Sequence, residues 1–385
     1  MREIYFDNSS TTRPSEAVVE VMEKTLREDY GNPSSLHQKG VEAEHYIREA
    51  RSVIAGILKA DESEIIFTSG GTEANNLAVI GGALAGRRSG KRIVTTEMEH
   101  PAVAEPAAFL ERLGFEIVRV PVDREGNLDL EFLGNAVTED TLVVSTMFVN
   151  NEIGSVVPVE QAAKLVHEKN PKTLYHVDAI QAFGKYRMIP RDMGIDALSV
   201  SGHKLHGPKG TGFLYLNKHT HVLPVLYGGG QQGGMRSGTE NVPGIAGLAV
   251  AAREAYTDFD AKIEQLYLLK EHLISGLTEM GGCVIHGQPG RTGAPHIVNA
   301  AFPGVGAEVL LHTLEDQGIY VSAGSACSTH KRSASPTLSA IHAPKEETTS
   351  SVRFSFCPEN TMEEIDFTLD VLRKYLPMLR RYRAH

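Results

Sequence analysis

Short apolar segments alternate with longer helical patterns between about residue 60 and residue 220. These segments are apolar, several are rich in β-branched residues, and each ends in polar or glycine-rich residues, which is typical of βαβ units in a mostly parallel sheet. In such a sheet, binding residues gather at the carboxyl ends of the strands. The expected strands are residues 64–68, 92–96, 116–120, 142–148, 174–177, 197–200 and 212–216.

The pattern changes after this region. Glycine is dense over residues 228–244, and a helical pattern over residues 247–280 then connects to a second set of elements. The pattern of this second set predicts strands at 284–286, 296–301, 319–322 and 352–356, and helices at 308–317 and from 362 onward. We therefore predict an α/β chain in which a large domain, residues 13–255, carries the mostly parallel sheet. A smaller α+β C-terminal domain comprises residues 256–385 together with residues 1–12.

Composition limits the class of protein. The chain has 385 residues, of which 41% are hydrophobic and 22% charged, so it is an ordinary folded protein and not a disordered one. Acidic residues outnumber basic ones, 48 to 38, so a net charge of −10 gives no support for direct nucleic-acid binding. The N-terminus lacks the apolar segment of a signal peptide, and no apolar stretch has membrane-spanning length. We expect a cytoplasmic protein without a membrane partner.

Cysteine and histidine spacing gives little support for a metal site. Three widely spaced cysteines predict no disulfide framework and fit a reducing compartment. The pairs His203/His206 and Cys327/His330 have spacings that occur in zinc sites, but no second ligand pair at matching spacing accompanies either pair. The sequence therefore predicts no bound metal.

A small-residue turn lies between the expected strand at 64–68 and a helical stretch that follows it. The turn contains Ser69, Gly70, Gly71 and Thr72. Unpaired N–H groups at a helix N-terminus bind anions well, and glycines allow a phosphate to approach the backbone closely. Thr72 or Ser69 could equally be a routine N-cap of a helix with no ligand. The turn alone does not decide between these two interpretations.

An acid and a lysine each follow a further strand. Asp178 closes the strand at 174–177, and Lys204 follows the strand at 197–200. Each has an ordinary alternative, since Asp178 could be a helix N-cap and Lys204 a solvent-facing side chain. A half-buried lysine can instead act as an amine nucleophile toward a carbonyl cofactor. Together the anion-binding turn, the acid and the lysine match what pyridoxal phosphate needs for its phosphate, ring nitrogen and aldehyde.

These residues resemble the class V, fold-type I pyridoxal-phosphate enzymes, and within them the cysteine desulfurases of the NifS/IscS type. The resemblance extends over nearly the whole chain. The matching segments are residues 5–12, 31–37, 69–76, 99–103, 150–154, 176–181, 199–210, 228–239, 325–327 and 352–355.

The resemblance implies a role for each matching residue. Lys204 would form the Schiff base with pyridoxal 5'-phosphate, Asp178 would pair with the ring nitrogen, and Gln181 would donate to the ring hydroxyl oxygen. His100 would stack on the ring and relay a proton, although a lone histidine is more often a satisfied core residue. The phosphate would be held by Gly71, Thr72, Ser201, His203 and, from the second subunit of a homodimer, Thr239.

The resemblance also implies the substrate and the reaction. Asn151, which would also contact the cofactor, and Arg353 would bind the carboxylate of L-cysteine, and Lys204 would remove its α-proton. The Cys327 thiolate would attack the substrate sulfur, leaving a persulfide on Cys327 and releasing L-alanine. A Gly/Ser-rich stretch followed by Lys331 and Arg332 favours a thiolate there, whereas Cys283 and Cys357 look like packing residues.

Two aspects stay open at this stage. The sulfur acceptor would be an iron–sulfur scaffold or a thiolation protein, which the sequence does not distinguish. The alternative reactions on the same fold are those of a selenocysteine lyase or of another class V aminotransferase or lyase. A non-catalytic protein that keeps the fold is disfavoured, because Lys204, Asp178, Arg353 and Cys327 are all intact.

Overall fold

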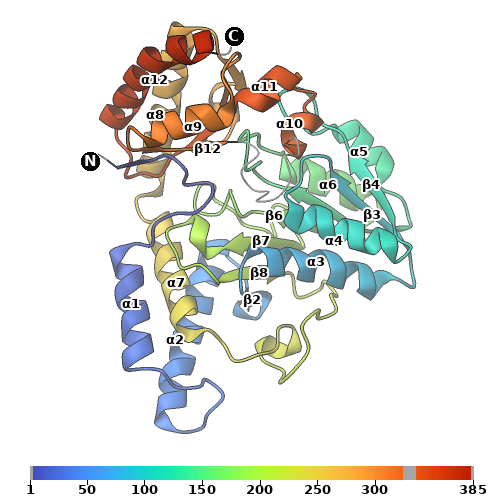
Figure 1. Ribbon diagram of the computed structural model, residues 1–385. Helices are drawn as coiled ribbons and strands as arrows, with labels where there is room; N and C mark the ends of the chain where they lie inside the picture. The colour runs from blue at the N-terminus through green and yellow to red at the C-terminus, as the bar shows by residue number, and fades with distance from the viewer. Residues whose placement is uncertain (1–2, 324–334, 383–385) are drawn as a thin grey trace.

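The computed structural model describes residues 3–323 and 335–382. Seven strands form its central sheet, in the order β2-β8-β7-β6-β5-β3-β4 (Figure 1). In this sheet β8 runs antiparallel to both of its neighbours, and the other neighbouring strands pair in parallel. The bounds are β2 (Ile65–Thr68), β3 (Arg92–Thr96), β4 (Glu116–Val120), β5 (Thr141–Met147), β6 (Leu174–Asp178), β7 (Ala197–Ser201) and β8 (Gly212–Leu216). The seven strands predicted from the sequence are confirmed, with ends that agree to within one residue.

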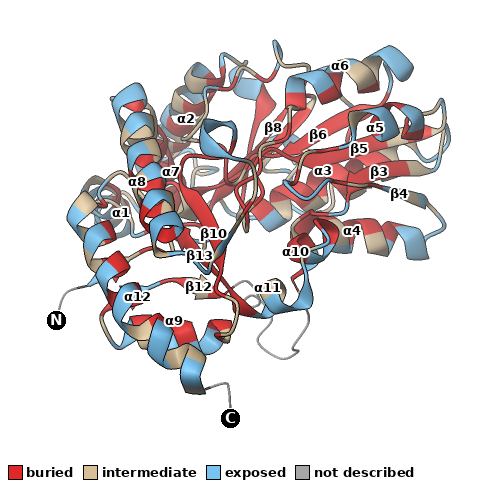
Figure 2. Ribbon diagram, turned by 90° about the horizontal axis from the view of Figure 1, so that it is seen from above, coloured by how far each residue is buried: buried red, intermediate tan, exposed pale blue. Residues whose placement is uncertain are grey.

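Helices cover both faces of this sheet. Because successive strand residues point to opposite faces, Ile66 packs in the apolar cluster under α3 (Gly71–Gly86), whereas Phe67 packs in the cluster on the other face. Figure 2 shows the buried sheet between helices whose outer sides are exposed. The other helices of this larger body are α1 (Glu16–Arg27), α2 (Gln38–Leu58), α4 (Pro101–Arg112), α5 (Leu130–Ala136), α6 (Val159–Lys169) and α7 (Val242–Tyr256).

The N-terminal strand and the C-terminal third of the chain share a separate apolar core, which joins Ile4 and Phe6 to side chains between Leu266 and Leu376. It contains an antiparallel sheet, β12-β13-β10-β9, and the parallel pair β1-β11. The strands are β1 (Ile4–Tyr5), β9 (Val284–His286), β10 (Ile297–Ala301), β11 (Ile319–Tyr320), β12 (Ser322–Ala323) and β13 (Ser351–Ser355). The helices after α7 are α8 (Phe259–Met280), α9 (Ala307–Glu315), α10 (Pro336–Ala340), α11 (Lys345–Ser350) and α12 (Met362–Tyr382). Within the described ranges, no helix is long and apolar enough to cross a membrane.

Two expectations in the second half of the chain are wrong. The helical pattern over residues 247–280 is interrupted, because α7 ends at Tyr256 and Asp258 adopts a left-handed conformation with φ of 51° before α8 begins. The strand expected at 319–322 is two short strands in different sheets, since β11 pairs with β1 and β12 pairs with β13. The short 3-10 helices are η1 (Glu62–Glu64), η2 (Gly202–Lys204), η3 (Gln232–Gly234) and η4 (Gly290–Thr292).

Candidate active site

The predicted site residues of the large body follow neighbouring strands of the central sheet. Asp178 is the last residue of β6, Lys204 ends η2 directly after β7, and His100 stands four residues after β3. Because these strands are parallel, their carboxyl ends lie at one edge of the sheet. The charge of Lys204 lowers the pKa of both His100 and Asp178, although burial is the largest influence on each. The structure therefore brings these three groups together.

Asp178 has a buried carboxylate whose hydrogen bonds fix the turn after β6. Its Oδ1 accepts a hydrogen bond from the Ile180 N–H at 3.0 Å, and its Oδ2 accepts one from Asn75 Nδ2 at 2.7 Å. Burial raises its pKa, whereas the hydrogen bonds and the nearby positive charges lower it. The helix N-cap alternative is wrong, since turns and not a helix follow Asp178. A carboxylate has about four acceptor positions, so Asp178 can accept a further N–H donor.

His100 caps α4 and has a defined proton position. The Ala102 N–H donates to Nδ1 of His100 at 3.0 Å. Burial lowers the pKa of His100, the negative charge of Asp178 opposes this, and the positive charge of Lys204 lowers the pKa further. Because Nδ1 accepts a hydrogen bond from the backbone, the neutral ring carries its proton on Nε2.

Lys204 is half-buried and contacts the N-terminal segment, so the solvent-facing alternative is wrong. Its Nζ donates to the carbonyl oxygen of Ser9 and, at 2.7 Å, to that of Ser10. Gln181 reaches the same segment, because its Nε2 donates to the Ser9 carbonyl oxygen at 2.9 Å. Residues 9 and 10 therefore bring Lys204 and Gln181 to one place.

The turn before α3 is the predicted anion-binding turn. The N-cap residue of α3 is Gly70, and no side chain caps the helix, so the alternative in which Ser69 or Thr72 serves as N-cap is wrong. Gly70 has φ of 147°, a conformation that favours glycine. The uncapped turn opens into a cavity of about 410 Å³ whose lining includes Gly71, Thr72, Ser201 and His203.

His203 takes part in this cavity as a neutral ring. Burial lowers its pKa to about 4, and the positive charges of Lys204 and Lys209 contribute. Its Nδ1 lies 3.2 Å from the Thr11 hydroxyl oxygen. An imidazole held in this way has its second nitrogen for a ligand in the cavity.

Arg353 reaches the site from β13 of the smaller body. Its Nη1 donates to the backbone oxygen of Asn151 at 2.7 Å, and its Nη2 donates to Asp7 Oδ1 at 2.9 Å and to the Ser10 hydroxyl at 2.6 Å. The guanidinium is buried, yet Nε has no hydrogen-bond partner among the residues that the structure describes. A buried donor without a partner calls for an acceptor that a ligand would supply.

Several contacts of the site were not predicted from the sequence. Asn75 binds Asp178, and His296 Nε2 lies 3.3 Å from Gln181 Oε1. Asp7 and Ser10 pair with Arg353. Asn75 stands one turn into α3, after the anion-binding turn, and that placement is the one local signal that could have identified it.

Two predicted residues are not placed among these groups. Cys327 lies outside the described residues. Thr239 is exposed in the loop before α7, and its assignment to the partner subunit's site stays a prediction. That loop is joined to the start of α3, because Arg236 Nε donates to Glu73 Oε1 at 2.8 Å.

The fold and this site define the class of protein. The model of the aminotransferase class-V family matches residues 4–367, and the chain belongs to that family. The cysteine desulfurase IscS of Dictyoglomus turgidum is 42% identical over 379 residues, which are 98% of this chain and 96% of that protein. A solved NifS-like protein has a TM-score of 0.93 and 38% identity over 98% of this chain and 100% of its own. SspA, solved in complex with cysteine, has a TM-score of 0.79 and 29% identity over 93% and 100% of the two chains.

Enzymes of this family depend on pyridoxal phosphate, and the donor set of this chain fits that cofactor. The uncapped start of α3 suits its phosphate, the buried Asp178 carboxylate suits a protonated ring nitrogen, and Lys204 is an amine at the same edge. A Cβ added to Gly71 would lie 2.1 Å from Ile180 Cδ1, so the floor of the anion-binding turn is closely packed.

Proposed function

We propose that the chain is a cysteine desulfurase that converts L-cysteine to L-alanine and holds the sulfur as a persulfide on Cys327. One observation carries this proposal. Lys204, Asp178 and His100 lie at one edge of the central sheet, beside the uncapped N-terminus of α3 and the buried Arg353. The similarity to proteins named cysteine desulfurase, at about 40% identity over nearly the full length, supports it.

Each cofactor-binding residue has a defined task. Lys204 would hold the cofactor covalently through Nζ, and Asp178 would keep the ring nitrogen protonated. Gln181 would donate its second amide N–H to the ring hydroxyl oxygen, and His100 would stack on the ring. Pyridoxal phosphate supplies an electron-accepting ring that stabilises negative charge on the substrate. The phosphate would be bound by Gly71, Thr72, Ser201, His203 and, from a second subunit, Thr239.

Arg353 would bind the carboxylate of L-cysteine. Two of its N–H groups are already occupied by Asp7 and Ser10, which orient the guanidinium, while Nε has no partner in the described part of the chain. The negative charge of Asp7 also compensates the buried cation before substrate arrives. Asn151 would complete the carboxylate site, and its carbonyl oxygen fixes Nη1 of Arg353.

Two residues of the chain would move protons. The neutral Lys204 amine would remove the α-proton of the substrate, and the Nε2–H of His100 would supply or relay a proton nearby. The Cys327 thiolate would then attack the substrate sulfur. An S–S bond forms, the C–S bond breaks with its electron pair on carbon, and protonation of that carbon gives alanine.

The ends of the segment that contains Cys327 lie beside the substrate-binding residues. Ser322 of β12 pairs in register with Arg353 of β13. At the other end, the Ser335 hydroxyl donates to Glu152 Oε2 at 2.5 Å, next to Asn151 in the chain. Cys327 is four residues after Ala323, and these anchors support its delivery to the substrate sulfur.

The partners and location belong to the same proposal. The functional unit would be a homodimer in which each subunit supplies Thr239 to its partner's cofactor. A sulfur-acceptor protein, either an iron–sulfur scaffold or a thiolation protein, would take the persulfide sulfur. A cytoplasmic location would suit a thiolate that must stay reduced between turnovers.

The purified holoenzyme tests the proposal when L-cysteine and excess dithiothreitol are supplied. We expect alanine and sulfide in equal amounts, because each persulfide formed releases one alanine and the dithiol reduces it to sulfide. Pyruvate and ammonia in place of alanine would indicate β-elimination and contradict the proposal. Turnover of L-selenocysteine without turnover of L-cysteine would favour the selenocysteine lyase alternative.

The low pKa of His100 predicts the acid side of the pH profile. As pH falls through that depressed pKa, Nδ1 becomes protonated and loses its hydrogen bond from Ala102, so kcat/KM should fall at a pH more acidic than the ordinary histidine pKa. His100→Asn keeps an acceptor for the α4 N-cap but has no titrating group. We expect this variant to lose about 10²-fold in kcat/KM and to lose this acid limb. An acid limb at the same pH in His100→Asn would assign the titration to another group.

A further inference from the structure

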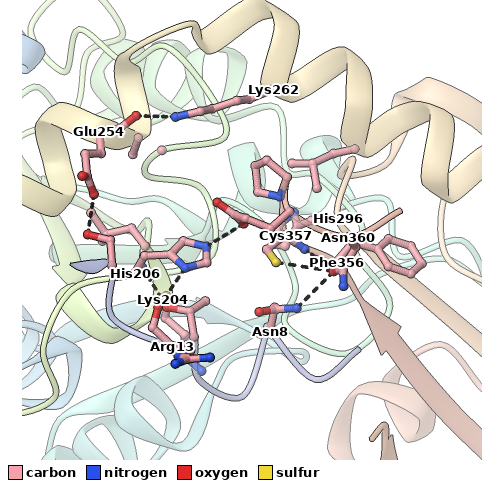
Figure 3. A pocket seen from close by; sticks show the side chains of 18 of the residues that line it. Asn8, Arg13, Lys204, His206, Glu254, Lys262, His296, Phe356, Cys357 and Asn360 are labelled. Carbon is pink, nitrogen blue, oxygen red and sulfur yellow. Dashed lines mark hydrogen bonds and ion pairs between the residues drawn. The ribbon is translucent and has the colours of Figure 1, made fainter. Parts of the chain in front are cut away.

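Three metal-ligating side chains converge on a large cavity near Lys204. His206, Cys357 and Glu359 each offer one donor atom, and these three atoms all lie within 4.8 Å of one another. All three residues line a cavity of about 1180 Å³ that Lys204 also lines. Figure 3 shows His206 and Cys357 on the wall of this pocket. In the described part of the chain, this is the one group of three such ligands.

The His206 ring is oriented as a metal ligand. Its Nδ1 lies 2.9 Å from the carbonyl oxygen of Arg13, and because a carbonyl oxygen only accepts, Nδ1 carries the proton (Figure 3). The lone pair is therefore on Nε2, which lies 3.7 Å from Glu359 Oε2. Metal-ligating histidines commonly donate their other ring N–H to a backbone carbonyl in this way.

The backbone of His206 is held in an uncommon conformation. Its φ is 62°, in the left-handed region that non-glycine residues rarely adopt. Its N–H donates to the Thr12 hydroxyl at 2.7 Å, and its carbonyl oxygen accepts from the Ser15 N–H at 3.1 Å. Such strain persists where the surroundings fix the residue, and it often marks a functional position.

A tight turn after β13 presents the other two ligands. Asn360 Oδ1 accepts the Cys357 N–H at 2.9 Å, and the Asn360 N–H donates to the Cys357 carbonyl oxygen at 3.1 Å. The Asn360 amide is itself fixed, because Nδ2 donates to Glu364 Oε2 at 2.9 Å. Cys357 is partly buried, and Glu359 has a side chain that is 69% exposed, so an ion can enter from solvent.

We propose that His206, Cys357 and Glu359 bind one zinc ion. Imidazole, thiolate and carboxylate are the ligands that zinc takes in proteins, and three of them leave a fourth position for water or a small ligand. Burial raises the pKa of Cys357 to about 12, so its thiol would release a proton to solvent when zinc binds. The resulting thiolate and the Glu359 carboxylate balance the charge of the dication. Donor atoms of a tetrahedral zinc site lie about 3.5 Å apart, so the three groups need shift by only about 1 Å.

The site would join two parts of the enzyme. His206 stands two residues after Lys204, and Cys357 stands four residues after Arg353. Zinc would therefore tie the segment that carries the nucleophile to the strand that carries the proposed substrate-binding arginine. Because an ion that binds only the folded chain stabilises it, zinc should raise the melting temperature.

Cobalt titration of the holoenzyme variant Cys283→Ser/Cys327→Ser tests the proposal, because Cys357 is then the only thiol. We expect one equivalent of Co²⁺ to give the d–d bands of a tetrahedral site, at wavelengths beyond the absorption of pyridoxal phosphate. Zinc should displace the cobalt and remove the bands. Zinc should also raise the melting temperature of this variant.

Substitutions of the ligands separate this site from other metal-binding groups. In the same background, Glu359→Gln and His206→Gln should each weaken cobalt binding by on the order of ten- to a hundredfold. Glu359 is exposed, so its substitution leaves the fold intact even if a change at Cys357 does not. Glu3→Gln is the matched control, since Glu3 lines the same cavity outside the ligand group, and it should bind cobalt as its parent does.

Three results would overturn the proposal. The first is the absence of tetrahedral cobalt bands with excess metal. The second is equal cobalt affinity in Glu359→Gln, His206→Gln and Glu3→Gln. The third is a zinc-dependent rise in melting temperature that persists in both ligand variants, which would place the bound ion elsewhere.

Discussion

Lys204→Ala is expected to yield a folded protein that has lost the yellow colour of the holoenzyme and its activity. Without Nζ there is no amine to bond the cofactor aldehyde and no base for the α-proton. Loss of a covalent nucleophile lowers kcat by on the order of 10⁴-fold or more. The hydrogen bonds from Nζ to the Ser9 and Ser10 carbonyl oxygens are also lost, although Gln181 still donates to Ser9. Visible absorption and alanine release measure the two effects.

A second half-buried lysine provides the matched control. Lys185 donates to the Lys204 carbonyl oxygen at 2.7 Å, and burial lowers its pKa to about 8. Its low pKa makes it the obvious rival nucleophile. Lys185→Met should keep the yellow colour, and borohydride reduction of the wild type should label the peptide that contains Lys204. A labelled Lys185 peptide, or a Lys204→Ala protein that stays yellow through dialysis, would show that the nucleophile is misassigned.

The local sequence was sufficient to predict the strands of the central sheet, but it was not sufficient to predict the connections around the smaller body. The seven strands are short apolar segments between polar turns, so each can be predicted without knowledge of its partners. The break between α7 and α8 falls at Thr257 and Asp258, where no glycine or proline marks it. The change of sheet between β11 and β12 depends on pairing with β1 and β13, which are distant in the sequence.

The same distinction applies to the site. Asp178, Lys204 and His100 could be predicted because each stands at or shortly after the carboxyl end of a strand. The partners of Arg353 could not, since Asp7 and Ser10 are more than 340 residues away in the sequence. Cys357 looked like a packing residue, and only the folded chain brings it to His206.

Cys327→Ser should retain the cofactor and its colour but release no sulfide from L-cysteine above background. A serine hydroxyl is not ionised at neutral pH and cannot form an S–S bond, so the sulfur has no acceptor. Cys283→Ser is the matched control. Burial raises the pKa of Cys283, and its Sγ donates to the Leu277 carbonyl oxygen at 3.3 Å, and both effects disfavour the thiolate. Cys283→Ser should form sulfide at the wild-type rate.

The state of the sulfur distinguishes the persulfide mechanism from direct elimination. After one turnover without reductant, the wild type should carry one extra sulfur atom on the peptide that contains Cys327, and an equal amount of alanine should be released. The Cys327→Ser protein should carry no extra sulfur, because the thiolate that would take it is missing. If Cys327→Ser released sulfide at the wild-type rate, the sulfur would leave without passing through this residue. Lys204 could then still hold the cofactor, but the enzyme would be a lyase and not a desulfurase.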